Sequence, residues 1–144
     1  MTKYSTIVSA VATKLNTLTG FKQSRFPFQF FGRTTNPLMH LGYSIGVNST
    51  SEHGNRQRTS GAGVEVITIL SVVFAFRLRP TEAYPTDYKN ALDKEEEVLL
   101  KLIGSYQTEA PKMQILFKSA AREIPNSLEY SIHTIELDVL HYIS

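Results

Sequence analysis

The sequence predicts an α+β fold in a single domain that spans residues 1–144. Apolar residues recur every three or four positions from Tyr4 to Leu18 and again from Tyr88 to Ile103, which is the pattern of amphipathic helices. Apolar and polar residues alternate in several other stretches, above all from Val64 to Leu78, which is the pattern of strands. A chain of 144 residues is long enough for one domain with a sizeable core.

The composition excludes several classes of protein. The chain has no cysteine, so it forms neither disulfides nor thiolate metal sites. Its net charge of +2, from 15 basic and 13 acidic residues, does not describe a dedicated nucleic-acid binder. The N-terminus is amphipathic rather than continuously apolar, and the most apolar stretch, Val66 to Phe76, is too short for a membrane helix. We therefore expect a soluble protein that is made in the cytoplasm and does not bind membranes.

The first third of the chain predicts one helix followed by two strands. Gly20 follows the Tyr4–Leu18 repeat at the place where a left-handed C-terminal cap is expected. The segment Phe26 to Phe31 is aromatic, and its proline cannot donate to a neighbouring strand, so we expect an edge strand there. From Met39 to Val47, apolar residues alternate with small or polar ones, which predicts a strand with one buried face.

The stretch from Val64 to Leu78 predicts an unusually long strand. Only Thr68 interrupts its apolar face, and its extended length is roughly 50 Å, whereas strands usually have about 3–10 residues. Either the strand bends at a bulge, or part of it projects and is covered by another copy of the protein. We favour the second possibility. The polar segment Ser49 to Gly63 predicts a flexible loop that becomes ordered on assembly.

The second helix and the last two strands complete the predicted fold. Asp87 lies where a helix N-terminus favours an acid, and the acidic run Asp93, Glu95, Glu96 and Glu97 predicts a solvated helix face. A short strand is expected around Met113 to Phe117. In the final strand, Leu128 to Ile143, the apolar positions change parity near His133 and Thr134, which predicts a β-bulge or bend there.

The sequence contains no pattern typical of an active site. The four histidines are not spaced as metal ligands, because His133 and His141 lie about 26 Å apart along an extended strand. The glycine-rich stretch Ser60 to Gly63 precedes a strand rather than a helix, so it lacks the helix N-terminus that binds phosphate. No nucleophile elbow or other triad signature is present. We expect no catalytic residue, no metal and no cofactor.

Two pairs of opposite charge have matching spacing. Arg77 and Arg79 lie two apart in one predicted strand, and Glu136 and Asp138 lie two apart in another. Two arrangements stay open: a cross-strand ladder inside one subunit, or an ionic contact between two subunits. A catalytic carboxylate pair is less favoured, because the sequence offers no apolar pocket that would raise one pKa.

Taken in order, several segments form a recognisable pattern. They are a leading helix, the Met39–Val47 strand, a polar loop with arginines, a long strand ending Phe76-Arg77-Leu78-Arg79-Pro80, a helix through Asp87-Tyr88-Lys89-Asn90-Ala91-Leu92, and a closing strand from Tyr130 to Leu137. This order resembles the tail terminator (tail-completion) proteins of long-tailed bacteriophages, over nearly the whole chain.

The resemblance implies both a fold and a role. The implied fold is an α+β subunit with a mostly antiparallel twisted sheet, a long central hairpin, and two amphipathic helices packed on it. The implied role is a structural virion protein of the phage neck, assembled in the host cytoplasm. Six copies would form a ring on the tail tube protein, stop tube growth and offer a docking surface to the head-completion or connector protein. Genomic DNA would pass through the lumen without specific binding.

The charged residues named so far are then candidates for subunit or tube contacts. They are His53, Arg56, Arg58, Arg77, Arg79, Glu136 and Asp138. Arg56 and Arg58 are expected to contact acidic protein groups or line the lumen sparsely. Two other functions stay open: another head–tail neck or tail-tube protein, and a weak nucleic-acid-binding module that would use Arg56, Arg58, Lys22 and Arg25 on phosphates.

Overall fold

The computed structural model describes residues 3–23, 40–52, 64–79, 81–103, 113–124 and 129–143. In these ranges the chain forms helices α1 (Tyr4–Asn16) and α2 (Tyr84–Ile103) and strands β1 (Lys22–Gln23), β2 (Gly42–Glu52), β3 (Val64–Arg77), β4 (Met113–Glu123) and β5 (Tyr130–Ile143). The strand order is β1-β2-β3-β5-β4, and only β1 and β2 are parallel. The predicted α+β class is therefore confirmed. Neither helix combines the length and apolar character needed to cross a bilayer, as far as the described residues go.

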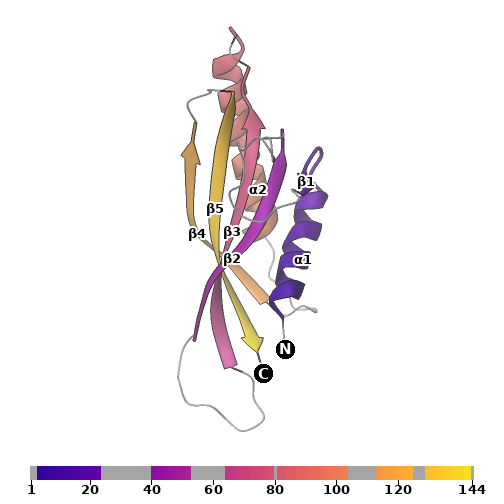
Figure 1. Cartoon of the computed structure of the whole chain (residues 1–144), viewed down its shortest axis with the longest axis vertical. Helices are drawn as coiled ribbons and strands as arrows, with labels where there is room; N and C mark the ends of the chain where they lie inside the picture. The colour runs from indigo at the N-terminus through magenta and orange to yellow at the C-terminus, as the bar shows by residue number, and fades with distance from the viewer. Residues whose placement is uncertain are drawn as a thin grey trace, which may run out of the picture.

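The long strand predicted from Val64 lies in the middle of the sheet. β3 pairs with β5 without interruption, from Val64 opposite Ile143 to Arg77 opposite Tyr130. On its other side, β2 runs antiparallel to it and forms a long two-stranded ribbon. Figure 1 shows the strong twist of these strands and their lower ends running past the first turn of α1. β3 thus has two long partners and does not bend at a bulge of its own.

Bulges occur instead in the two strands that flank the central pair. The register shifts between Val47 and Ser49 in β2, and between Phe117 and Ser119 in β4, which leaves Asn48 and Lys118 as the extra residues. The bulge predicted at His133 and Thr134 is wrong. Odd-numbered residues of β5 are buried from Ser131 to His141, and the apparent change of parity arises because Ser131 and His133 are polar residues in the core.

The predicted loop from Ser49 to Gly63 begins later than expected. Residues 49–52 continue β2 beyond its bulge, and the hydroxyl oxygens of Thr50 and Thr68 lie 3.0 Å apart across the two strands. The prediction failed here because the backbone of this polar segment pairs with β3, which polarity alone does not reveal. Residues 53–63, and the edge strand predicted at Phe26 to Phe31, lie outside the described residues.

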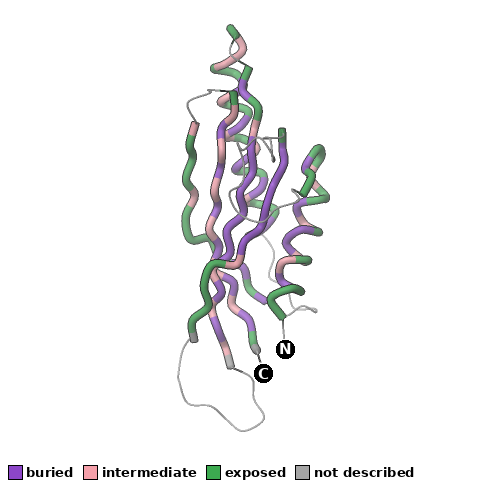
Figure 2. Tube along the Cα trace, in the orientation of Figure 1, coloured by how far each residue is buried: buried purple, intermediate pink, exposed green. Residues whose placement is uncertain are grey.

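Both helices pack on one face of the sheet, which we call the inner face. Its core combines residues from α1, α2 and all four longer strands, namely Ile7, Val11, Leu15, Tyr43, Ile45, Leu70, Val72, Val98, Leu102, Met113, Ile115, Ile135, Leu137 and Val139. The alternate strand residues lie on the opposite, outer face. Figure 2 shows burial concentrated in β2, β3 and β5, while most of β4 is exposed.

The turn after α1 positions the start of the sheet. α1 ends at Asn16, earlier than predicted, and Gly20 adopts a positive φ of 87° in the turn that follows. Leu41 also has a positive φ, of 58°, and its N–H donates to the Ala75 carbonyl at 2.7 Å. Because the side chain of Leu41 lies against Gly20, this turn and the start of β2 pack directly on each other.

Candidate assembly interface

Arg79 is held by an acid of its own chain. Its Nε and Nη2 donate to the two carboxylate oxygens of Asp87 at 2.9 and 2.8 Å, and its backbone N–H donates to Asp87 at 3.0 Å. Asp87 lies in the first turn of α2, where the helix dipole also favours a negative charge. The hydrogen bonds from Arg79 lower the pKa of Asp87 to about 2. Arg79 therefore joins the end of β3 to α2.

A shallow hollow of about 330 Å³ opens beside this ion pair and is lined by His40, Phe76, Arg77, Arg79 and Asp87. The His40 ring meets Phe76 edge-on, with centroids 4.7 Å apart. Nδ1 of His40 accepts a hydrogen bond from the backbone N–H of Arg77 at 3.0 Å. Burial, with Arg77 nearby, lowers the pKa of His40, so the ring is neutral at pH 7 and carries its proton on Nε2.

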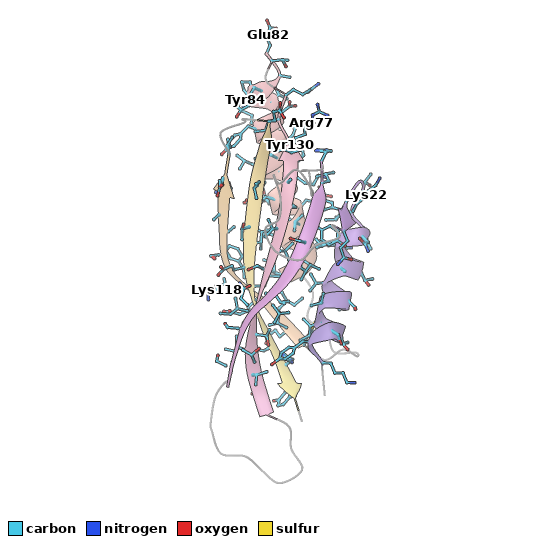
Figure 3. All side chains as sticks on the ribbon, viewed as in Figure 1. Lys22, Arg77, Glu82, Tyr84, Lys118 and Tyr130 are labelled. Atoms are coloured by element: carbon cyan, nitrogen blue, oxygen red, sulfur yellow. The ribbon has the colours of Figure 1, made fainter. Side chains whose placement is uncertain are left out.

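The Arg77 side chain is exposed at the end of β3. Figure 3 shows it at the same end of the sheet as Tyr130, its register partner on β5. Within the described ranges, no ion pair of the Arg77 guanidinium is present. It thus differs from Arg79, whose charge Asp87 already balances.

Glu136 and Asp138 lie on the outer face, because they alternate with the core residues of β5. Their register partners on β3 are Ser71 and Ile69, so neither is opposite an arginine. The cross-strand ladder inside one subunit is therefore wrong. The antiparallel register places Arg77 opposite Tyr130, six residues farther along β3 than Ser71, which is a separation of about 20 Å.

Large apolar side chains are exposed around the lower half of the outer face and along β4. Leu116 and Phe117, just before the β4 bulge, are 41% and 47% exposed, and Tyr142 near the end of β5 is 50% exposed. Leu116 is next to Asp138 in the register, and Ile69 flanks Asp138 on the other side. A carboxylate therefore lies between two apolar neighbours on a sheet face to which neither helix contributes core residues.

A second polar cluster lies on the inner face, where Ser131, His133 and Glu95 are buried and Arg122 is partly exposed. His133 Nδ1 lies 2.8 Å from Glu95 Oε1, Ser131 Oγ lies 2.8 Å from His133 Nε2, and Arg122 donates to Glu95 Oε2. Since a carboxylate only accepts, His133 donates from Nδ1 and accepts from Ser131. This order of Ser, His and Glu resembles a hydrolase triad, but Ser131 and His133 are 0% exposed, so a substrate cannot reach the hydroxyl in this structure.

The protonation states in this cluster follow from its geometry. Burial lowers the pKa of His133, and the hydrogen bond to Glu95 opposes that effect without reversing it. Burial raises the pKa of Glu95, but hydrogen bonds from Arg122 and His133 outweigh it, and the net pKa is lowered. A neutral imidazole therefore donates to a charged carboxylate, which Arg122 balances. His133 also stacks on Phe74, with centroids 4.7 Å apart.

The position of Glu95 corrects the prediction of a fully solvated acidic run. Glu95 is buried, whereas Asp93, Glu96 and Glu97 are exposed. Ala91, Glu95, Val98 and Leu102 are all buried and recur every three or four residues, so they share the inner side of α2. That spacing is present in the sequence and could have identified Glu95, but its partners could not be known without the sheet register.

The structure brings together only part of the predicted contact set. Arg77 and Arg79 share the hollow, Glu136 and Asp138 share the outer face, and His53, Arg56 and Arg58 lie outside the described residues. His40 and Asp87 were not predicted to belong to this site, because only the fold places them beside the end of β3. Among the described residues, no group of three side chains could hold a metal ion. A scan against protein-family models and a search of curated proteins found no match to this chain.

Proposed function

We propose that this protein is a phage tail terminator. Six copies form a ring on the end of the tail tube, stop its growth and offer a docking surface to the head connector. The proposal rests on the resemblance in the order of segments and on one structural observation. The two described helices lie on the inner face of the sheet, while Leu116 and Tyr142 are exposed on the outer face and Phe117 is exposed on the edge strand β4. Such apolar exposure on a small protein is typical of a surface that binds another protein.

A closed ring would cover the apolar residues that the long sheet leaves exposed. In a cyclic head-to-tail assembly, each subunit covers part of its neighbour, so no copy keeps the whole surface in water. The β2–β3 ribbon extends past the first turn of α1 (Figure 1), which lets it reach beyond its own core. We expect the neighbouring copy to bury the apolar residues of β4 and β5.

Stopping tube growth requires a surface that does not accept another tube ring. Among the described strands, β4 is an edge strand, and β1 pairs with β2 only at Gly42 and Tyr43. Both β2 and β4 carry a bulge, at Asn48 and Lys118. Bulges and charged side chains on edge strands oppose the addition of another strand. These edges therefore suit a capping protein better than a polymerising one.

The small net charge agrees with a ring through which DNA passes. A lumen lined by many arginines and lysines would hold phosphates by releasing counterions and would slow ejection of the genome. At +2 for each copy, the chain carries little excess positive charge. DNA would thus pass through the proposed ring without binding tightly to it.

The test combines the purified protein with unfinished tails, and uses negative-stain electron microscopy and analytical ultracentrifugation. We expect sixfold rings, and tubes that are capped and stay at constant length after the protein is added. A strictly monomeric protein that remains monomeric with tails present would contradict the proposal. Long tubes formed by the protein alone would instead identify a tube protein. Tight, steeply salt-dependent DNA binding would identify a nucleic-acid-binding module.

A further inference from the structure

Opposite charges lie on this subunit at places where they cannot meet. Arg77 ends β3 opposite Tyr130, while Glu136 and Asp138 lie farther along β5 opposite Ser71 and Ile69. The separation, about 20 Å for Glu136 and about 26 Å for Asp138, is set by the strand register, so side-chain rotation cannot close it.

Within the described part of the chain, neither the arginine nor the two carboxylates have a counter-ion. No ion pair of Arg77, Glu136 or Asp138 is present there. Arg79 is not available as a substitute, because Asp87 binds it through both carboxylate oxygens. Arg77 is exposed, and the hydrogen bond from its backbone N–H to His40 holds in place the backbone that carries its side chain. Arg77 is therefore a cation without a counter-ion among the described residues.

The surroundings of the two carboxylates favour a cationic partner over an apolar one. Asp138 lies between Ile69 and Leu116 in the register, and Glu136 lies between Ser71 and Ser119. A partner that covers the apolar neighbours also removes water from the carboxylates, and a charge buried without a counter-ion is costly. Arginine suits this position, because its guanidinium can donate to two carboxylates at once.

We infer that Arg77 of one copy binds Glu136 and Asp138 of an adjacent copy. The inference rests on the proposed ring and names the contact that holds neighbouring subunits together. Each copy carries both halves of the contact, so the same interaction repeats as copies are added. Arg77 then contributes orientation and specificity, while Leu116 and its neighbours contribute the apolar area.

Charge exchange tests the contact directly. Arg77→Glu alone, and the pair Glu136→Lys with Asp138→Lys alone, should each weaken association by at least about tenfold, because like charges then face each other. Mixing the two variants should restore assembly, since each supplies the charge that the other needs. A restored ring must alternate the two variants and so contain an even number of subunits. The triple variant should assemble alone.

Matched controls carry the same charge changes elsewhere. Lys89→Glu exchanges an exposed cation on α2, and Asp93→Lys with Glu96→Lys exchanges two exposed acids on the same helix. These should leave association within about twofold, and all variants should keep the thermal midpoint of the wild type to within a few degrees.

The outcomes separate this inference from the proposed function. If the wild type forms rings but the variants assemble normally, or if mixing fails to restore assembly, the Arg77 contact is wrong and the ring stands. If mixing restores only dimers, and the wild type is also a dimer with tails present, the contact stands and the ring is wrong. A wild type that stays monomeric overturns both.

Discussion

His133 and Glu95 are joined by a hydrogen bond of 2.8 Å that links the middle of the sheet to α2. Arg122 of β4 binds the same carboxylate, and Ser131 binds the other side of the imidazole. Both ring nitrogens of His133 and both carboxylate oxygens of Glu95 therefore have a partner, although these two residues are buried. Removing one member leaves the others buried without a partner, which costs more than the hydrogen bond itself contributes.

Glu95→Ala should lower the free energy of unfolding by about 2–4 kcal/mol, because it leaves the buried His133 N–H without an acceptor and removes the acid that balances Arg122. Urea denaturation measures the change. Glu96→Ala is the matched control, because Glu96 is exposed on the same helix, and it should change stability by less than about 0.5 kcal/mol. Equal stability of the two variants would show that the cluster contributes nothing.

Stability should decrease as the pH falls below about 6.5. Burial lowers the pKa of His133 in the folded protein below its ordinary value of 6.5. Just below pH 6.5, His133 is therefore protonated in the unfolded chain but still neutral in the folded one. Unfolding is then favoured as the pH falls. His40, whose pKa is also lowered, acts in the same direction. Urea titrations from pH 8 to 5 should show the decrease in the free energy of unfolding. The His40→Gln variant should still show the part of this decrease that is due to His133. A flat profile in both proteins would contradict it.

A second loss of stability should appear at lower pH and depend on Asp87. The pKa of this carboxyl lies at about 2, below its ordinary value of 3.8, so the charged form stabilises the folded state above pH 3.8 and this stabilisation disappears as the pH falls toward 2. Asp87→Asn should remove this step from the acid-denaturation curve while the step near pH 6.5 remains. Asp93→Asn, an exposed acid on the same helix, should keep both steps.

Gly20→Ala should destabilise the protein by about 1–3 kcal/mol. The backbone at Gly20 has a φ of 87°, and an added Cβ would lie 2.9 Å from Cδ1 of Leu41. Leu41 is buried and itself has a positive φ, so it has little freedom to move away. Thermal or urea unfolding measures the effect. Thr19→Ala, an exposed change in the same turn, should be close to neutral.

Leu116→Ser with Phe117→Ser should weaken assembly while leaving the subunit folded. These residues are 41% and 47% exposed, so the isolated subunit loses only the buried part of each side chain, whereas the proposed neighbour would lose its apolar contact. Sedimentation velocity should show loss of the ring at concentrations where the wild type is assembled. Leu100→Ser, 63% exposed on α2, is the control. Rings formed equally by the double variant and the control would exclude this surface.

Much of the fold can be predicted from local patterns in the sequence. The apolar repeats indicate α1 and α2, and the alternation from Val64 to Leu78 identifies the central strand to within one residue of its end. The prediction was less accurate where polar residues join the core or the sheet. Ser131 and His133 suggested a bulge, and residues 49–52 suggested a loop, because the partners that satisfy these polar groups come from other parts of the chain.

The sequence by itself determined the fold class, the helices and the absence of cysteine chemistry, because periodicity and composition act locally. Only the tertiary structure decided how the charges are partnered. Arg77 and Arg79 have the same spacing as Glu136 and Asp138, which suggested a cross-strand ladder. The strand register separates the two pairs instead, and the packing of α2 places Asp87 where it binds Arg79. Spacing along a strand fixes the distance between neighbouring side chains, whereas register and packing decide which side chains lie opposite them.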